Sequence, residues 1–81
     1  MKLSEKTFSN RTLITVIPSS LKEDFSSILM KIKKLKMQPF HYVFIAIPDE
    51  FIIVFKKQLF DSGLDIKQFE SKDGVSKLEI V

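Results

Sequence analysis

The stretch that decides the fold is Phe40–Ile47, FHYVFIAI, an almost continuous apolar run that ends at Pro48-Asp49-Glu50. Side chains alternate between the two faces of a β-strand, and here the side chains expected on both faces are mainly apolar. A strand of this kind needs cover on both faces, as strands in the middle of a sheet have. We therefore expect this run to form a central strand.

The residues before this run predict a second strand and a helix. Thr12–Ile17, TLITVI, is rich in β-branched residues and is bounded by Pro18, which is typical of a strand. Ser20 and Glu23 have the spacing of a capping box, so we expect a helix from Ser20 to about Met37. Its apolar residues fall within one arc of roughly 120°, as in a helix that packs on a sheet: Leu21, Phe25, Ile28, Leu29, Ile32 and Leu35.

The residues after the central strand carry helix signals at both ends. Pro48-Asp49-Glu50 suits the first turn of a helix, and Ser62-Gly63 provides a stop. We therefore expect a helix over Asp49–Ser62. The alternative is that Phe51–Phe55, FIIVF, forms a strand paired with the preceding run, because β-branched residues favour strands.

The end of the chain predicts a hairpin. Leu64–Glu70 and Val75–Val81 flank Lys72-Asp73-Gly74, and Asp-Gly is a strong turn signal. Residues 1–10 are polar, and we interpret them as a frayed tail or a weak strand. The predicted fold class is therefore α/β (α+β), with one domain over residues 11–81, the order βαβαββ and a four-stranded mixed sheet packed with two helices. The sequence leaves open whether the helices lie on one face or on both.

This order of elements is similar to that of Alba-type chromatin and RNA-binding proteins, of the C-terminal domain of initiation factor three and of sulfur-carrier folds. The similarity covers nearly the whole chain. The residues that mark these families differ, because Pro18-Ser19-Ser20 stands where Alba has a lysine pair and Pro48-Asp49-Glu50 where it has a Gly/Arg-rich turn. The long basic arm is shortened to Lys72-Asp73-Gly74, and there is no Cys for a sulfur-carrier motif. The resemblance implies a fold and lends little to function.

Composition restricts the classes of protein. The chain has 81 residues, 44% of them hydrophobic, which is enough for one globular domain. Without Cys, disulfides, thiolate metal sites and thiol catalysis are excluded. No apolar stretch has the length of a membrane span or the form of a signal peptide, so we expect a cytoplasmic protein with no membrane partner.

No catalytic or cofactor signature is present. Phosphate loops, dinucleotide fingerprints and nucleophile elbows are missing, and the single histidine, His41, has no orienting partner at a recognisable spacing. Asp49 and Glu50 follow the central strand, where open α/β sheets bind ligands, but acids that cap a helix have the same pattern. We expect no enzyme, no cofactor and no metal.

Two binding functions are compatible with the sequence. The second helix would carry apolar residues on more than one side, which predicts a non-enzymatic protein-interaction or regulatory module that forms a homodimer through this helix and the sheet. The residues assigned to that partner interface are Phe51, Ile53, Val54 and Phe60. The alternative assumes that apolar exposure of this kind is ordinary in a small domain.

The second hypothesis is weak, sequence-independent nucleic-acid binding. The net charge of +3 divides into +5 over residues 1–40 and −2 over residues 41–81. The candidate residues are Arg11, Lys31, Lys33, Lys34 and Lys36. Lysines at a helix C-terminus are also favoured by the helix dipole alone. A single arginine among thirteen basic residues argues against sequence-specific contacts.

Overall fold

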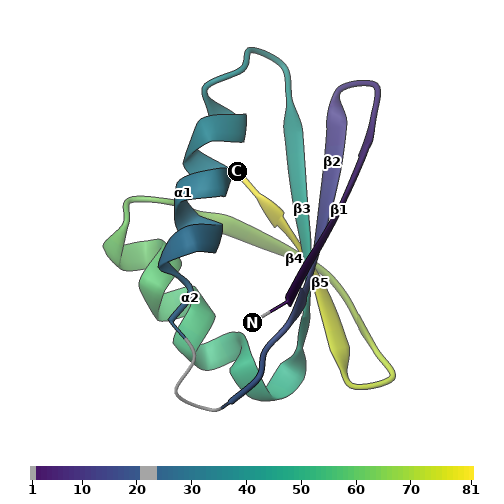
Figure 1. The fold of residues 1–81 in the computed structure, drawn as a ribbon, viewed down its shortest axis with the longest axis vertical. Helices are drawn as coiled ribbons and strands as arrows, with labels where there is room; N and C mark the ends of the chain where they lie inside the picture. The colour runs from purple at the N-terminus through teal and green to yellow at the C-terminus, as the bar shows by residue number, and fades with distance from the viewer. Residues whose placement is uncertain (1, 21–23) are drawn as a thin grey trace.

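The computed structural model describes residues 2–20 and 24–81, with the backbone only at 68 and 69 (Figure 1). Its elements, in chain order, are β1 (Lys2–Phe8), β2 (Arg11–Ile17), α1 (Ser26–Lys36), β3 (Tyr42–Pro48), the 3-10 turn η1 (Asp49–Phe51), α2 (Ile52–Asp61), β4 (Ile66–Lys72) and β5 (Val75–Ile80). The α/β class predicted from the sequence is confirmed.

One mixed sheet holds all five strands, in the order β1-β2-β3-β5-β4. β2 and β3 are parallel, and the other neighbouring pairs are antiparallel. β3 lies in the middle, as its apolar run predicts, but the expected cover on both of its faces is wrong, because only one face is packed by helices and Tyr42 on the other is 45% exposed. Both helices lie on the same face of the sheet, which answers the question that the sequence left open (Figure 1).

The predicted four-stranded sheet is wrong, because the polar N-terminal segment forms a strand, the second of the two alternatives that the sequence left for it. β1 pairs antiparallel with β2 through seven residue pairs, and the predicted order βαβαββ therefore gains a strand at its start. The turn between them contains Ser9, whose φ is 58°. β1 is an edge strand with six of its seven residues exposed, so the apolar alternation that marks a half-buried strand is missing.

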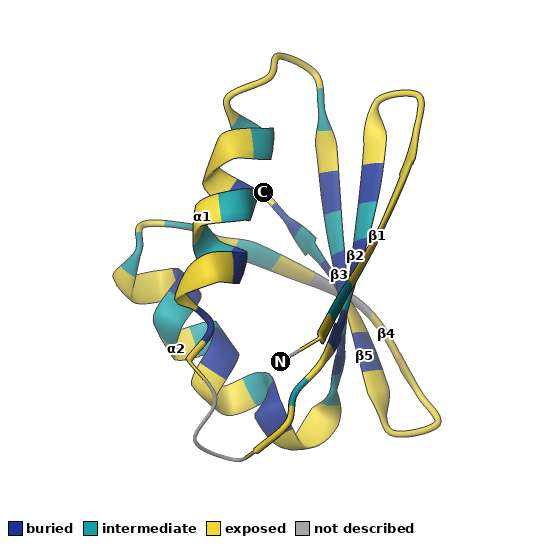
Figure 2. Cartoon of the chain, in the orientation of Figure 1, coloured by how far each residue is buried: buried dark blue, intermediate teal, exposed yellow. Residues whose placement is uncertain are grey.

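The core lies between the helices and one face of the sheet (Figure 2). Phe25 packs edge to face on Phe55, with 5.4 Å between ring centroids, and on Phe51 at 6.3 Å. Alternate residues of β2, β3 and β5 complete this core: Ile14, Val16, Val43, Ile45, Ile47, Leu78 and Ile80. The two helices therefore cover one face of the sheet, and a single apolar core lies between them and that face.

The first helix is shorter than predicted. α1 begins at Ser26, whose backbone N–H donates to the Asp24 carboxylate at 3.0 Å. This contact satisfies one of the free N–H groups at the helix start. The capping box predicted from Ser20 to Glu23 involves residues 21–23, which lie outside the described residues.

The second helix and the final hairpin form as predicted. Residues 49–61 form η1 and then α2, so the alternative strand over Phe51–Phe55 is wrong. Gly63 follows the helix with a φ of 77°. Between β4 and β5, Asp73 and Gly74 have φ values of 55° and 75°, which are the left-handed angles of a type I′ hairpin turn.

Candidate functional site

The face of the sheet that points away from α1 and α2 is not covered by any helix or strand of the described residues (Figures 1 and 2). We call this surface the open face. It consists of the residues that alternate with the buried ones along the strands: Lys2, Ser4, Lys6 and Phe8 of β1, Arg11, Leu13, Thr15 and Ile17 of β2, Tyr42, Phe44, Ala46 and Pro48 of β3, Val75, Lys77 and Glu79 of β5, and Lys67, Glu70 and Lys72 of β4.

Two exposed aromatic residues flank the only arginine of the chain on the open face. In the strand register, Arg11 is paired with Phe8 on one side and with Tyr42 on the other. The side chain of Phe8 is 83% exposed and that of Tyr42 is 45% exposed. The strand register therefore places Arg11 between Phe8 and Tyr42 in a single row across three strands.

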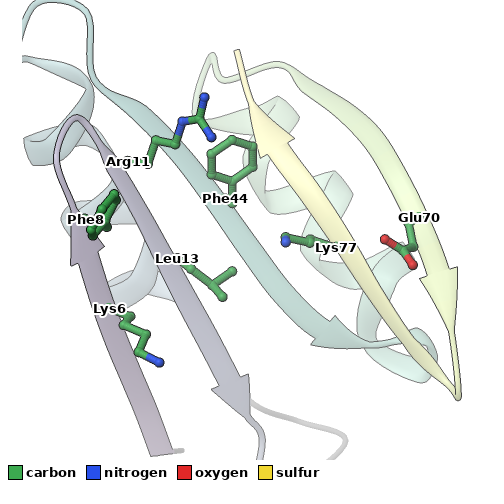
Figure 3. Close-up of a pocket in the computed structure, with 7 residues that line it drawn as sticks. All are labelled: Lys6, Phe8, Arg11, Leu13, Phe44, Glu70 and Lys77. Carbon is green, nitrogen blue, oxygen red and sulfur yellow. The ribbon is translucent and has the colours of Figure 1, made fainter.

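The next row places a third aromatic ring among charged residues. Leu13 is paired with Lys6 and with Phe44, and Phe44 is paired in turn with Glu79. Phe44 is half-buried, and Figure 3 shows its ring with one face toward the viewer on the open side of the sheet. Phe44 and Tyr42 are two residues apart on β3, so they project from the same side of the sheet about 7 Å apart.

A pocket of about 460 Å³ lies on the open face (Figure 3). The pocket is lined by Lys6, Phe8, Arg11, Leu13, Phe44, Glu70 and Lys77, which come from all five strands.

The open face is also the positively charged side of the molecule. Its strand residues include six basic side chains and two carboxylates, for a net charge of +4. The whole chain has a net charge of +3, so the remaining residues sum to −1. The division of charge between the two halves of the sequence is therefore less informative than the division between the two sides of the sheet.

The structure does not bring together the basic residues predicted to bind nucleic acid. Arg11 belongs to the open face, whereas Lys31, Lys33, Lys34 and Lys36 belong to α1 on the opposite side of the sheet. The ammonium of Lys31 forms an ion pair with Glu5 of β1. The five residues are therefore not a single site. Two of these lysines, Lys33 and Lys34, are exposed on the outer side of α1.

The predicted partner interface is only partly available. Phe51 is 6% exposed and packs against Phe25, so it belongs to the core and offers little surface to a partner. Ile53, Val54 and Phe60 are on the outer side of α2, where they are 82%, 43% and 80% exposed. These three residues form the outer surface of α2 that the sequence predicted to be apolar.

Asp49 is held by hydrogen bonds within the fold. Its carboxylate accepts hydrogen bonds from the hydroxyls of Ser71 and Ser76, and its N–H donates to the Gly74 carbonyl at 2.9 Å. Glu50 is exposed. Within residues 2–20 and 24–81, no cluster of three or more His, Cys, Asp or Glu side chains is arranged to hold a metal ion.

His41 is hydrogen-bonded rather than placed in a pocket. Its Nε2 lies 2.7 Å from the Oγ1 of Thr12, which is fully buried, and Thr12 is in turn 3.1 Å from the Oγ1 of Thr7. This short chain of side chains links β1, β2 and the start of β3. It satisfies a hydroxyl that would otherwise be buried without a partner.

Sequence reasoning missed Lys6, Phe8, Tyr42 and Lys77 as candidate site residues. The signal that could have found them was the alternation along the strands, because Phe8, Tyr42 and Lys77 each lie opposite a charged residue of a neighbouring strand and Lys6 is two positions from Phe8 on the same face. Using that signal requires the register between strands, which the sequence does not contain.

Neither of the α-helices among the described residues has the length and apolar character needed to cross a membrane. Comparisons with protein-family models, with curated proteins and with solved structures find no match to this chain.

Proposed function

We propose that this protein binds single-stranded nucleic acid on the open face through stacking and phosphate contacts, without reading a defined sequence. The observation that carries the proposal is the row in which Arg11 lies between the exposed rings of Phe8 and Tyr42, on a face with a net charge of +4. Unpaired bases stack on aromatic side chains, and basic side chains neutralise the phosphates.

Single strands fit this face better than duplexes. Aromatic rings on a sheet can stack only on bases that are not already stacked within a duplex. The face has one arginine, so it lacks the set of forked donors that reads base pairs in a groove. The expected mode is therefore stacking combined with phosphate contacts.

The charge of the open face argues against its use for self-association. Two copies placed face to face would bring net charges of +4 together without a compensating acidic surface. Binding of a polyanion is instead favoured by this charge, because each phosphate contact releases bound counterions. The predicted homodimer is therefore assigned to α2 alone.

Binding of a labelled short oligonucleotide of mixed sequence, followed by fluorescence anisotropy at low and then rising salt, tests this function. If Lys2, Lys6 and Arg11 each contact one phosphate, the logarithm of the binding constant should fall with the logarithm of the salt concentration with a slope of about −2. Single-stranded RNA or DNA should bind more tightly than a duplex of the same sequence.

A matched pair of variants separates this site from general positive charge. The double substitution K6E and R11E should abolish binding at low salt, because it reverses two charges on the open face. The double substitution K33E and K34E makes the same change in net charge on α1, and it should retain most of the binding. Equal loss in both double variants, or no binding of any oligonucleotide at low salt, would contradict the proposal.

A second candidate function is self-association through the outer surface of α2. Ile53 and Phe60 are seven positions apart, which places them on the same side of the helix, and both are at least 80% exposed. Light scattering at high concentration should then show a dimer that I53D or F60D converts to a monomer. M30D on the outer side of α1, at a position that is 73% exposed, is the control and should leave the dimer intact. A monomer in the unmodified protein would exclude this function.

A further inference from the structure

The acidic residues of the open face are confined to one half of it. On β1 and β2, Lys2, Lys6 and Arg11 are the charged residues of this face. On β4 and β5, the carboxylates of Glu70 and Glu79 lie among three lysines. The first half has a net charge of +3 and the second half a net charge of +1, so phosphates are attracted more strongly to the first half. A bound strand would therefore place its backbone over β1 and β2 and direct its bases toward β5.

Glu79 is the carboxylate of the open face that lies beside an aromatic ring. In the register of β3 and β5 it is the direct neighbour of Phe44, and β4 places Lys67 on its other side. Glu79 is half-buried, and no ion pair or side-chain hydrogen bond joins it to another residue of the described parts of the chain. Its oxygens therefore retain their capacity to accept hydrogen bonds from a ligand in partly desolvated surroundings.

We propose that Glu79 selects the base that stacks on Phe44, so that the open face prefers cytosine, adenine and guanine over uracil and thymine. This inference rests on the proposed single-strand binding. An ionised carboxylate only accepts hydrogen bonds, and the three preferred bases each offer an amino group at the edge. Uracil and thymine present one N–H between two carbonyl oxygens, whose lone pairs face the carboxylate unfavourably.

Glu70 provides the comparison within the same face. It lies in the row of Lys77, at the rim of the pocket, and it is exposed. Its charge is the same, but it is not the register neighbour of an aromatic ring. Its substitution therefore changes the charge of the open face by the same amount without removing the acceptor beside Phe44.

The test compares oligocytidine with oligouridine of the same length, each competing for the protein against one labelled oligonucleotide of mixed sequence. The unmodified protein should bind oligocytidine about five- to tenfold more tightly, the lower part of the range for selective base contacts, because the site is partly exposed. The same preference should hold for the deoxy strands, cytosine over thymine.

The variants isolate the carboxylate. E79Q should reduce the ratio of the two affinities to about one, because the amide offers both a donor and an acceptor. E70Q should raise both affinities through its charge and leave their ratio unchanged. Equal affinities in the unmodified protein, or an unchanged ratio in E79Q, would overturn the inference while single-strand binding stands. Absence of binding to every oligonucleotide at low salt would overturn both.

Discussion

The carboxylate of Asp49 accepts a hydrogen bond from the hydroxyl of Ser76 at 2.5 Å. Ser76 is 2% exposed, so this contact satisfies a hydroxyl that has little access to water. A second hydrogen bond comes from Ser71 at 3.0 Å. Together these two hydrogen bonds connect the start of η1 to the hairpin of β4 and β5. The connected residues are more than twenty positions apart in the sequence.

Substitution of Asp49 should therefore destabilise the fold. D49A removes two hydrogen bonds to a carboxylate and leaves the Ser76 hydroxyl without its partner, which should lower the free energy of unfolding by about 2 kcal/mol. Urea denaturation measures this change. E50A, at the adjacent exposed position, is the control and should change stability by less than about 0.5 kcal/mol. Equal effects of the two substitutions would contradict a tethering role for Asp49.

Phe55 should be among the residues on which stability depends most. It is fully buried, and its ring packs edge to face on Phe25. F55A should cost about 3–5 kcal/mol, because it leaves a cavity and removes the ring contact. F60A on the same helix removes an 80% exposed ring and should cost less than about 0.5 kcal/mol. Thermal denaturation of both variants distinguishes a core ring from a surface ring.

Tyr42 provides a direct optical probe of the open face. The chain has one tyrosine and no tryptophan, so its intrinsic fluorescence comes from this side chain. Stacking of a base on the ring should quench the emission as a single-stranded oligonucleotide is added. Y42A should weaken binding by about five- to a hundredfold.

The control for this probe is F40A, which removes a ring that is 87% exposed in the loop before β3. Its binding and its tyrosine quenching should match those of the unmodified protein. Oligonucleotide binding that leaves the emission of Tyr42 unchanged would place the bound bases away from this ring.

Glycine should be preferred at position 74 because of the backbone angle there, and not because a side chain would clash. Its φ is +75°, and a Cβ at this position would meet nothing within 4 Å. G74A should therefore lower the free energy of unfolding by about 1 kcal/mol, because a residue with a Cβ is strained in the left-handed conformation. Chemical denaturation checks this value. A loss of several kcal/mol would instead indicate a hidden steric contact.

Local signals predicted most of the individual elements. The helical spacing of Phe25, Ile28 and Ile32 identified the buried side of α1, because a helix that packs on a sheet must place its apolar residues along one side. Pro48 before η1 and Gly63 after α2 marked the ends of the second helix. These signals depend on backbone angles and neighbouring residues, which the sequence specifies directly.

The candidate site was predicted less well. The clustering of lysines in α1 suggested a nucleic-acid site, yet Arg11 lies on the other side of the sheet and Lys31 is paired with Glu5. The row of Phe8, Arg11 and Tyr42 joins three strands, two of which are separated by a helix. Proximity along the chain was therefore a poor guide to proximity in space.

By itself, the sequence determined the α/β class, the two helices, the central position of the Phe40–Ile47 run and the final hairpin. It did so because apolar periodicity and turn residues act over a few positions. Only the tertiary structure decided that residues 2–8 form a fifth strand and that both helices cover the same face. Strand pairing and the side taken by each helix depend on contacts between distant residues, so the open face, with its aromatic rings and its positive charge, emerges only when the whole sheet is assembled.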